Sequence, residues 1–149
     1  VQGAAGAEAQ SHLKVMLKYG TNVVAGVVPA FKTDSIEGVS AYRMLKDAIE
    51  KYSPNTSIIF VPAHYAFDAI MEAVYYGIKT IVVITEGIPV HDMIKVKQYI
   101  RNKDMHLIGP NCPGVISPDE SKVGIMPGHI HKKGNTGVVS RSGKCSIPC

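Results

Sequence analysis

The sequence is poor in the residues that several classes of protein depend on. It has no tryptophan and only three cysteines among 149 residues, Cys112, Cys145 and Cys149. An odd number of cysteines without a C-x-x-C pair matches neither a disulfide framework nor a zinc site, so we expect a reducing compartment. The longest nearly apolar stretch, residues 23–31, is far shorter than the ~20 residues of a membrane helix. The sequence therefore predicts no membrane span.

Residue 1 is not methionine, and no signal or transit pattern follows it. Because the chain opens inside a strand-to-helix motif, we expect residues to precede Val1 in the natural protein. The composition is 46% hydrophobic and 19% charged, which is typical of a globular chain. The length fits one domain with its own core.

Acidic side chains are missing from the end of the chain. Residues 1–120 contain 11 basic and 12 acidic side chains, whereas residues 121–149 contain 5 basic and no acidic ones. A basic end suits phosphate, nucleic acid or an acidic partner subunit, and it equally suits a solvated surface. No aromatic residue lies among these charges, so stacking on bases has no support and we expect no nucleic-acid partner.

Short apolar runs rich in β-branched residues alternate with stretches of helical period. We expect a first strand that ends at residues 1–2, further strands over 22–28, 57–61, 79–85, 106–108 and 137–140, and a short extended piece over 38–42. Helices are predicted over 9–19, 43–52, 65–76 and 89–103, with a long loop after residue 109. This alternation predicts an α/β fold with a parallel sheet and helices on both faces.

Ligands of such folds bind beyond the carboxyl ends of the strands. In the first of these loops Gly3 and Gly6 lie between a strand and a helix, as they would in a phosphate-binding turn or in a tight turn without a ligand. A nicotinamide cofactor would need an acid at the end of the second strand, and none occurs there before Asp34. A phosphate-bearing ligand without that ribose contact fits better.

The histidines and Cys112 offer little catalytic chemistry. His129 and His131 would share one face of a strand and suit a metal, but no Cys, Asp or Glu follows them within reach in the sequence, so we expect a surface hairpin and no metal site. Cys112 would suit either contact with a thiol ligand or a nucleophile. Because no histidine lies near it in the sequence, a closely packed loop cysteine is the favoured interpretation.

Four longer strings point to a known family. They are Ile-Thr-Glu-Gly-Ile-Pro at 84–89, Ile-Gly-Pro-Asn-Cys-Pro-Gly-Val-Ile at 108–116, Gly-Ile-Met-Pro-Gly-His-Ile-His-Lys at 124–132 and Val-Ser-Arg-Ser-Gly at 139–143. Together they resemble the α subunit of succinate–CoA ligase, an enzyme of the tricarboxylic acid cycle. The resemblance implies a Rossmann-like CoA-binding domain over 1–143, followed by a divergent or truncated tail over 144–149.

The resemblance also implies a binding site for CoA, with residues that fall into four groups. Residues near the phosphates and adenosine would be Ala5, Gly6, Ala7 and Glu8. Residues that wall the ligand would be Val61, Pro62, Ile84, Thr85 and Glu86, and residues near its thiol would be Asn111 and Cys112. Lys32 is the remaining candidate, adjacent to Phe31, where the family has a phosphate-contacting lysine. No catalytic residue is implied, because no histidine here matches the family's phosphohistidine motif.

For the whole enzyme the resemblance implies the reaction of succinate, CoA and a nucleoside triphosphate to succinyl-CoA, a nucleoside diphosphate and phosphate. The implied partners are a β subunit in a hetero-oligomer and a small dicarboxylate, in the cytoplasm or the mitochondrial matrix. An alternative is a divergent, non-catalytic paralogue that acts as a subunit-pairing module. It is suggested by Ala5 in place of threonine, by Phe31 in place of lysine, and by the absence after Gly143 of the tyrosine that the family has at its carboxylate substrate. Glu8 also stands in place of the family's glutamine.

Overall fold

The computed structural model describes residues 1–30 and 33–135. Its helices are α1 (Ala7–Lys18), α2 (Leu45–Tyr52), α3 (Ala63–Tyr75), α4 (Val90–Ile100) and the short 3-10 helix η1 (Gly128–Ile130). Its strands are β1 (Gly26–Val27), β2 (Ser35–Ile36), β3 (Val39–Tyr42), β4 (Thr56–Ile59), β5 (Thr80–Val83), β6 (His106–Ile108), β7 (Gly114–Ser117) and β8 (Ser121–Gly124). The expected sequence of alternating strands and helices is confirmed up to β6.

The main sheet is parallel, and Gln2 lies at its centre. Gln2 bridges Val27 on one side and Ile59 on the other, so the order across the sheet is β3, β1, Gln2, β4, β5, β6. Its N–H donates to the Ile58 carbonyl at 2.8 Å, and its own carbonyl accepts the Phe60 N–H at 3.0 Å. The chain leaves Gln2 toward one edge and later returns to build the other. The order therefore reverses beside Gln2, at the type of position where ligands of such sheets bind.

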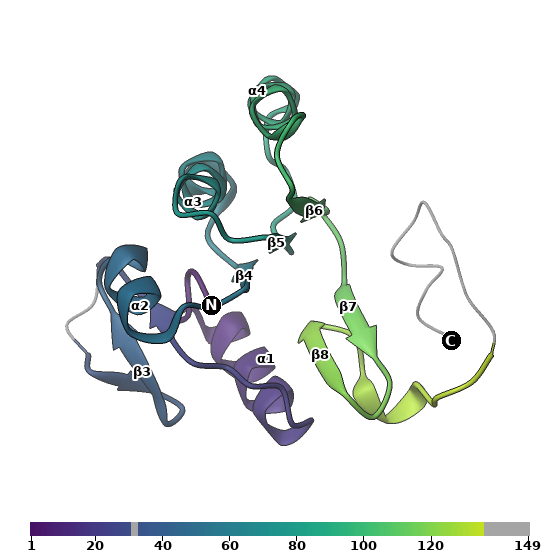
Figure 1. Cartoon of the computed structure of the whole chain (residues 1–149). Coiled ribbons are helices and arrows are strands. Elements are labelled where there is room, and N and C mark those ends of the chain that lie inside the picture. The colour runs from purple at the N-terminus through teal and green to yellow at the C-terminus, as the bar shows by residue number, and fades with distance from the viewer. Residues whose placement is uncertain (31–32, 136–149) are drawn as a thin grey trace.

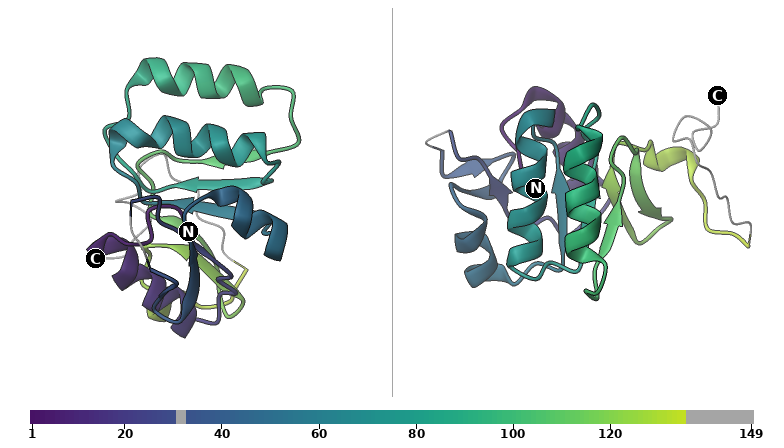
Figure 2. Two further views of the ribbon diagram at one scale, coloured as in Figure 1. Left: turned by 90° about the vertical axis from the view of Figure 1, so that its left-hand side faces the viewer. Right: turned by 90° about the horizontal axis from the view of Figure 1, so that it is seen from above.

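Helices cover both faces of this sheet, as predicted (Figure 1). On one face α3 and α4 run side by side (Figure 2), and buried residues of β4 and β5 such as Ile59 and Ile81 pack beneath them with Ile70 and Val96. On the other face α1 buries Leu13 and Met16 against the sheet, and the β7–β8 hairpin packs beside it. None of the helices in the described part of the chain combines the length and apolar character needed to cross a membrane.

Several predicted boundaries are wrong. The strand expected over 22–28 is assigned only over β1, because only Gly26 and Val27 pair with β3. The extended piece at 38–42 is half of a hairpin, since β3 also pairs antiparallel with β2. Glu37 and Gly38 form the turn between them with φ of 51° and 80°, as expected for a tight two-residue hairpin turn.

The region predicted as a long loop after residue 109 contains the antiparallel hairpin of β7 and β8. Its strands have glycine and serine at their ends and no clean alternation of apolar and polar residues, so the pattern gave no strand signal. The hairpin expected around His129 and His131 is wrong as well, because η1 occupies residues 128–130. The strand predicted over 137–140 lies outside the described residues.

Candidate functional site at the carboxyl ends of the strands

The first loop of the predicted site is a tight turn that only glycine can begin. Gly3 follows Gln2 with φ of +80°, and a Cβ atom there would lie 2.9 Å from the backbone nitrogen of Val61. The Gly6 N–H then donates to the Gly3 carbonyl at 3.2 Å. The turn thus lies directly against the chain that leaves β4, at the point where the strand order reverses.

Helix α1 starts in this loop with Gly6 as its N-cap and has no side-chain cap. The Gln10 N–H bonds to the Gly6 carbonyl at 2.9 Å, so the amides of the preceding first turn have no acceptor within the helix. Gly6, Ala7 and Glu8 are exposed. Unpaired backbone N–H groups and the positive end of the helix dipole together favour the binding of an anion. The Glu8 carboxylate suits the helix start but repels a phosphate.

The predicted residues of the next three loops are joined by hydrogen bonds. The Thr85 hydroxyl donates to the Val61 carbonyl at 2.7 Å. The Asn111 N–H donates to the Thr85 carbonyl at 3.0 Å. Ile84 packs with the α1 face of the core. Val61, Thr85 and Asn111 therefore form a connected row that begins beside Gly3, and the structure brings most of the predicted wall together.

The other predicted residues differ in how they take part. Pro62 is exposed and caps the start of α3, and Glu86 is exposed in the loop after β5. Ala5 is half-buried, and its carbonyl accepts the Gln10 side-chain amide at 2.9 Å. Lys32 and its neighbour Phe31 lie outside the described residues.

Cys112 is a packed loop cysteine in this structure. Its Sγ lies 3.3 Å from the Val83 carbonyl and 3.7 Å from the Ile108 carbonyl, and both carbonyls accept the thiol proton. Burial raises the pKa of the Cys112 thiol above its ordinary value, which reduces its thiolate fraction at neutral pH. The geometry favours the packing role over a nucleophile.

His12 is a neighbour of the site that the sequence analysis did not single out. It lies one helical turn after Glu8 on α1, and its ring stacks on Phe60 with centroids 6.1 Å apart. Burial and then the nearby charge of Lys122 lower the pKa of His12, while Glu8 opposes them. The i, i+4 spacing from Glu8 was the one sequence signal for this placement. Within residues 1–30 and 33–135, no group of three or more His, Cys, Asp or Glu is arranged to hold a metal ion.

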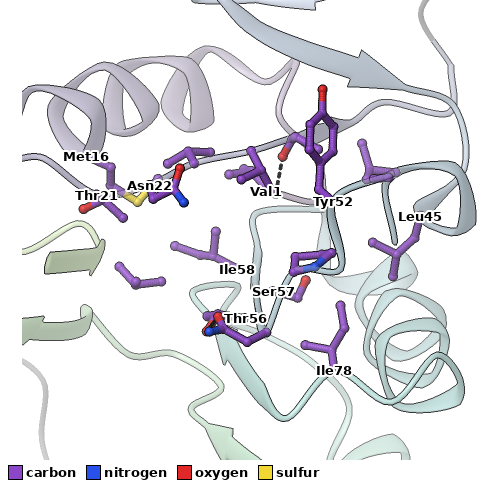
Figure 3. A pocket seen from close by; sticks show the side chains of 18 of the residues that line it. Val1, Met16, Thr21, Asn22, Leu45, Tyr52, Thr56, Ser57, Ile58 and Ile78 are labelled. Carbon is purple, nitrogen blue, oxygen red and sulfur yellow. Dashed lines mark hydrogen bonds between the residues drawn. The ribbon is translucent and has the colours of Figure 1, made fainter. Parts of the chain in front are cut away.

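A pocket of about 330 Å³ lies elsewhere, at the amino ends of the central strands (Figure 3). Val1, Ala25, Thr56 and Ser57 are among the residues that line it, and the amino group of Val1 donates to the Ala25 carbonyl at 2.8 Å. None of the predicted site residues lines it. The predicted site is instead an open surface of loops, which is the form that phosphate binding by backbone amides takes.

Comparisons with known proteins show which family the chain belongs to. A family model described as a CoA binding domain matches residues 1–87. The α subunit of the ADP-forming succinate–CoA ligase of Staphylococcus epidermidis is 51% identical over 143 residues, which are 96% of this chain and 47% of that protein. The corresponding subunit of Aquifex aeolicus is 52% identical over 145 residues, or 96% and 48% of the two chains. The chain thus spans about half the length of the curated relatives that it matches.

Solved structures resemble the fold. A Pyrococcus horikoshii crystal structure superposes with a TM-score of 0.76 at 25% identity, covering 92% of this chain and 32% of that one. The ATP citrate lyase of Methanothrix soehngenii, solved with citrate and coenzyme A, has a TM-score of 0.70 at 19% identity, covering 83% and 22%. These likenesses confirm the expected Rossmann-like architecture.

Proposed function

Because the chain belongs to the family of CoA-binding domains, we propose that it binds CoA at the carboxyl ends of its strands. The observation that carries this proposal is the uncapped start of α1 beside the point where the strand order reverses. Gly6, Ala7 and Glu8 would offer backbone N–H groups to the phosphates. The row from Val61 through Thr85 to Asn111 would then guide the pantetheine arm toward Cys112. Lys32 remains part of the proposed phosphate site.

We further propose that the chain is the CoA-binding part of the α subunit of a nucleoside-triphosphate-dependent succinate–CoA ligase. The identity to such subunits over nearly the whole chain supports this assignment. CoA is then a substrate, a small dicarboxylate is the second substrate, and a β subunit is the partner. The proposed site binds and orients CoA, and the phosphohistidine step belongs to sequence that these 149 residues do not contain.

The direct test is titration calorimetry of CoA into the chain at low salt, beside the variant Ala7→Pro. Proline is well tolerated at the first helical position, and the extended Gly6 backbone, with ψ of 143°, suits a residue before proline. The variant removes one N–H from the proposed site without removing a helical bond. We expect its CoA affinity to fall about tenfold, the equivalent of one hydrogen bond to a charged group, with its melting temperature unchanged. No binding heat and no melting shift of the parent chain at millimolar CoA would refute the proposal and favour the pairing module.

The charge of Glu8 gives a second prediction. Glu8→Gln removes a carboxylate from the proposed phosphate site, so we expect CoA to bind roughly two- to fivefold more tightly, the usual size of a charge effect at a helix start. The matched control is Glu50→Gln, which removes an exposed carboxylate from α2, where Glu50 pairs with Lys46. Equal effects of both variants on the CoA affinity would place the phosphates away from α1.

A further inference from the structure

Lys122 in β8 is an unusual lysine because it has no exposed surface at all. Lysine side chains are almost never fully buried unless they are paired. The Nζ atom donates to the carbonyl of Gly124, two residues along the same strand, at 2.6 Å. Burial lowers the pKa of this amine. A buried ammonium is expensive to keep, so its position calls for a reason.

The backbone of Lys122 is attached to the end of α1. The Thr21 hydroxyl donates to the Lys122 carbonyl at 2.7 Å and accepts the Lys122 N–H at 3.0 Å. Thr21 itself closes the helix, because its N–H bonds to the Met16 carbonyl at 3.0 Å. At the hairpin turn the Asp119 N–H donates to the Tyr19 hydroxyl at 3.1 Å. The hairpin is thus anchored to the same helix whose first turn forms the proposed phosphate site.

The Gly124 carbonyl, which accepts the Lys122 hydrogen bond, lies where the β7–β8 hairpin meets the loop of Asn111 and Cys112. Gly124 is the register partner of Gly114, the first residue of β7, where that loop ends. A Cβ atom on either glycine would lie 2.6 Å from the Cα atom of the other. The next residue, Ile125, donates its N–H to the Pro113 carbonyl at 2.8 Å. Backbones this close cannot shift independently, so the position of Gly124 sets the position of the loop.

We propose that Lys122 is a positioning residue: it links the end of α1 to Gly124 and so sets the distance between the phosphate end and the thiol end of the CoA site. The proposal rests on the proposed function in one respect, namely that CoA spans both ends. A methionine would fill the same volume and leave the carbonyl of Gly124 without its donor. The substitution removes the cost of burying a charge but leaves a buried carbonyl unpaired, so its two effects on stability oppose each other. A selective loss of CoA affinity is therefore what separates positioning from a general structural role.

The test compares Lys122→Met with the parent chain for two ligands, CoA and adenosine 3′,5′-bisphosphate, which is CoA without its 4′-phosphopantetheine arm. We expect the variant to lose about tenfold in CoA affinity, as for one charge-assisted hydrogen bond, and to bind the bisphosphate unchanged. Equal loss for both ligands, or no loss for either, overturns the positioning role. If Lys122→Met does not fold, Thr21→Val breaks the same link from the helix side and should produce the same selective loss.

A second measurement keeps the positioning role separate from CoA binding itself. In a chain with Cys145 and Cys149 replaced by serine, we expect Lys122→Met to raise the rate at which Cys112 reacts with a disulfide reagent, because the loop releases its thiol from the Val83 carbonyl. If Lys122→Met raises this rate but the parent chain binds no CoA, the proposed function is refuted and the positioning role stands. An unchanged rate together with CoA binding unaffected by the variant would refute the positioning role alone.

Discussion

Gly109→Ala is expected to destabilise the fold by roughly 3 kcal/mol or more, the sum of a left-handed backbone strain and an overpacked contact. Gly109 follows β6 with φ of +97°, and a Cβ atom there would lie 2.4 Å from the Val83 carbonyl oxygen and 3.0 Å from Cys112 Sγ. The first of these atoms belongs to the backbone of β5, which is paired with both β4 and β6 and cannot move aside. The loop must therefore lift away from β5.

Urea unfolding of the variant and the parent chain measures this loss, and Gly77→Ala is the matched control. Gly77 ends α3 with φ of +75° but has nothing within 4 Å of an added Cβ, so its replacement should cost only about 1 kcal/mol of strain. CoA affinity is expected to fall in Gly109→Ala and to stay unchanged in Gly77→Ala. Equal destabilisation by the two substitutions would mean that the close approach at Gly109 is absent in solution.

The parts of the fold that could be predicted from the sequence are those with a strong apolar period. α3 and β5 lie within two residues of their predicted bounds, because their buried residues repeat at helical spacing or fill a continuous run. The β7–β8 hairpin could not be predicted in this way. The hairpin is held by the hydrogen bonds of the Thr21 hydroxyl to the Lys122 backbone and by the contact of Gly114 with Gly124. The first joins residues far apart in the sequence, and the second joins residues without a side chain.

The candidate site likewise has a part that the sequence pattern predicts and a part that depends on tertiary contacts. The strand ends could be located from the strand pattern alone. Val61 and Thr85 are the last residues of the strands predicted over 57–61 and 79–85, and Asn111 lies in the loop expected after residue 109. The surroundings of His12 and Lys122 could not be predicted, since they depend on the three-dimensional contact of α1 with β8. From the sequence alone, a single lysine is expected to be exposed to solvent, and only the structure shows that Lys122 is buried.

Stability is expected to rise with pH between about 5 and 8 in a chain whose amino terminus is Val1. The amino group of Val1 lies between β1 and β4 and donates to the Ala25 carbonyl. Burial lowers its pKa from 8.0 to about 5. Within this window the unfolded chain binds a proton that the folded chain does not, so folding becomes more favourable as the pH rises. The gain is complete above pH 8 and is lost as the pH falls toward 5.

The size of this effect follows from the shift. A full shift of this kind is worth about 4 kcal/mol, and the adjoining pocket of about 330 Å³ has room for water that lowers the cost of the charge, so about 2 to 4 kcal/mol is expected. Urea unfolding at several pH values measures it. Acetylation of Val1 is the control, because an amide keeps the N–H donor for Ala25 and has no charge to lose. His12, whose pKa burial also lowers, contributes the same sign in both chains and cancels in the difference. Equal pH dependence in the free and acetylated chains would mean that the amine is solvated in the folded state. By the same reasoning, any residue joined before Val1 removes the dependence.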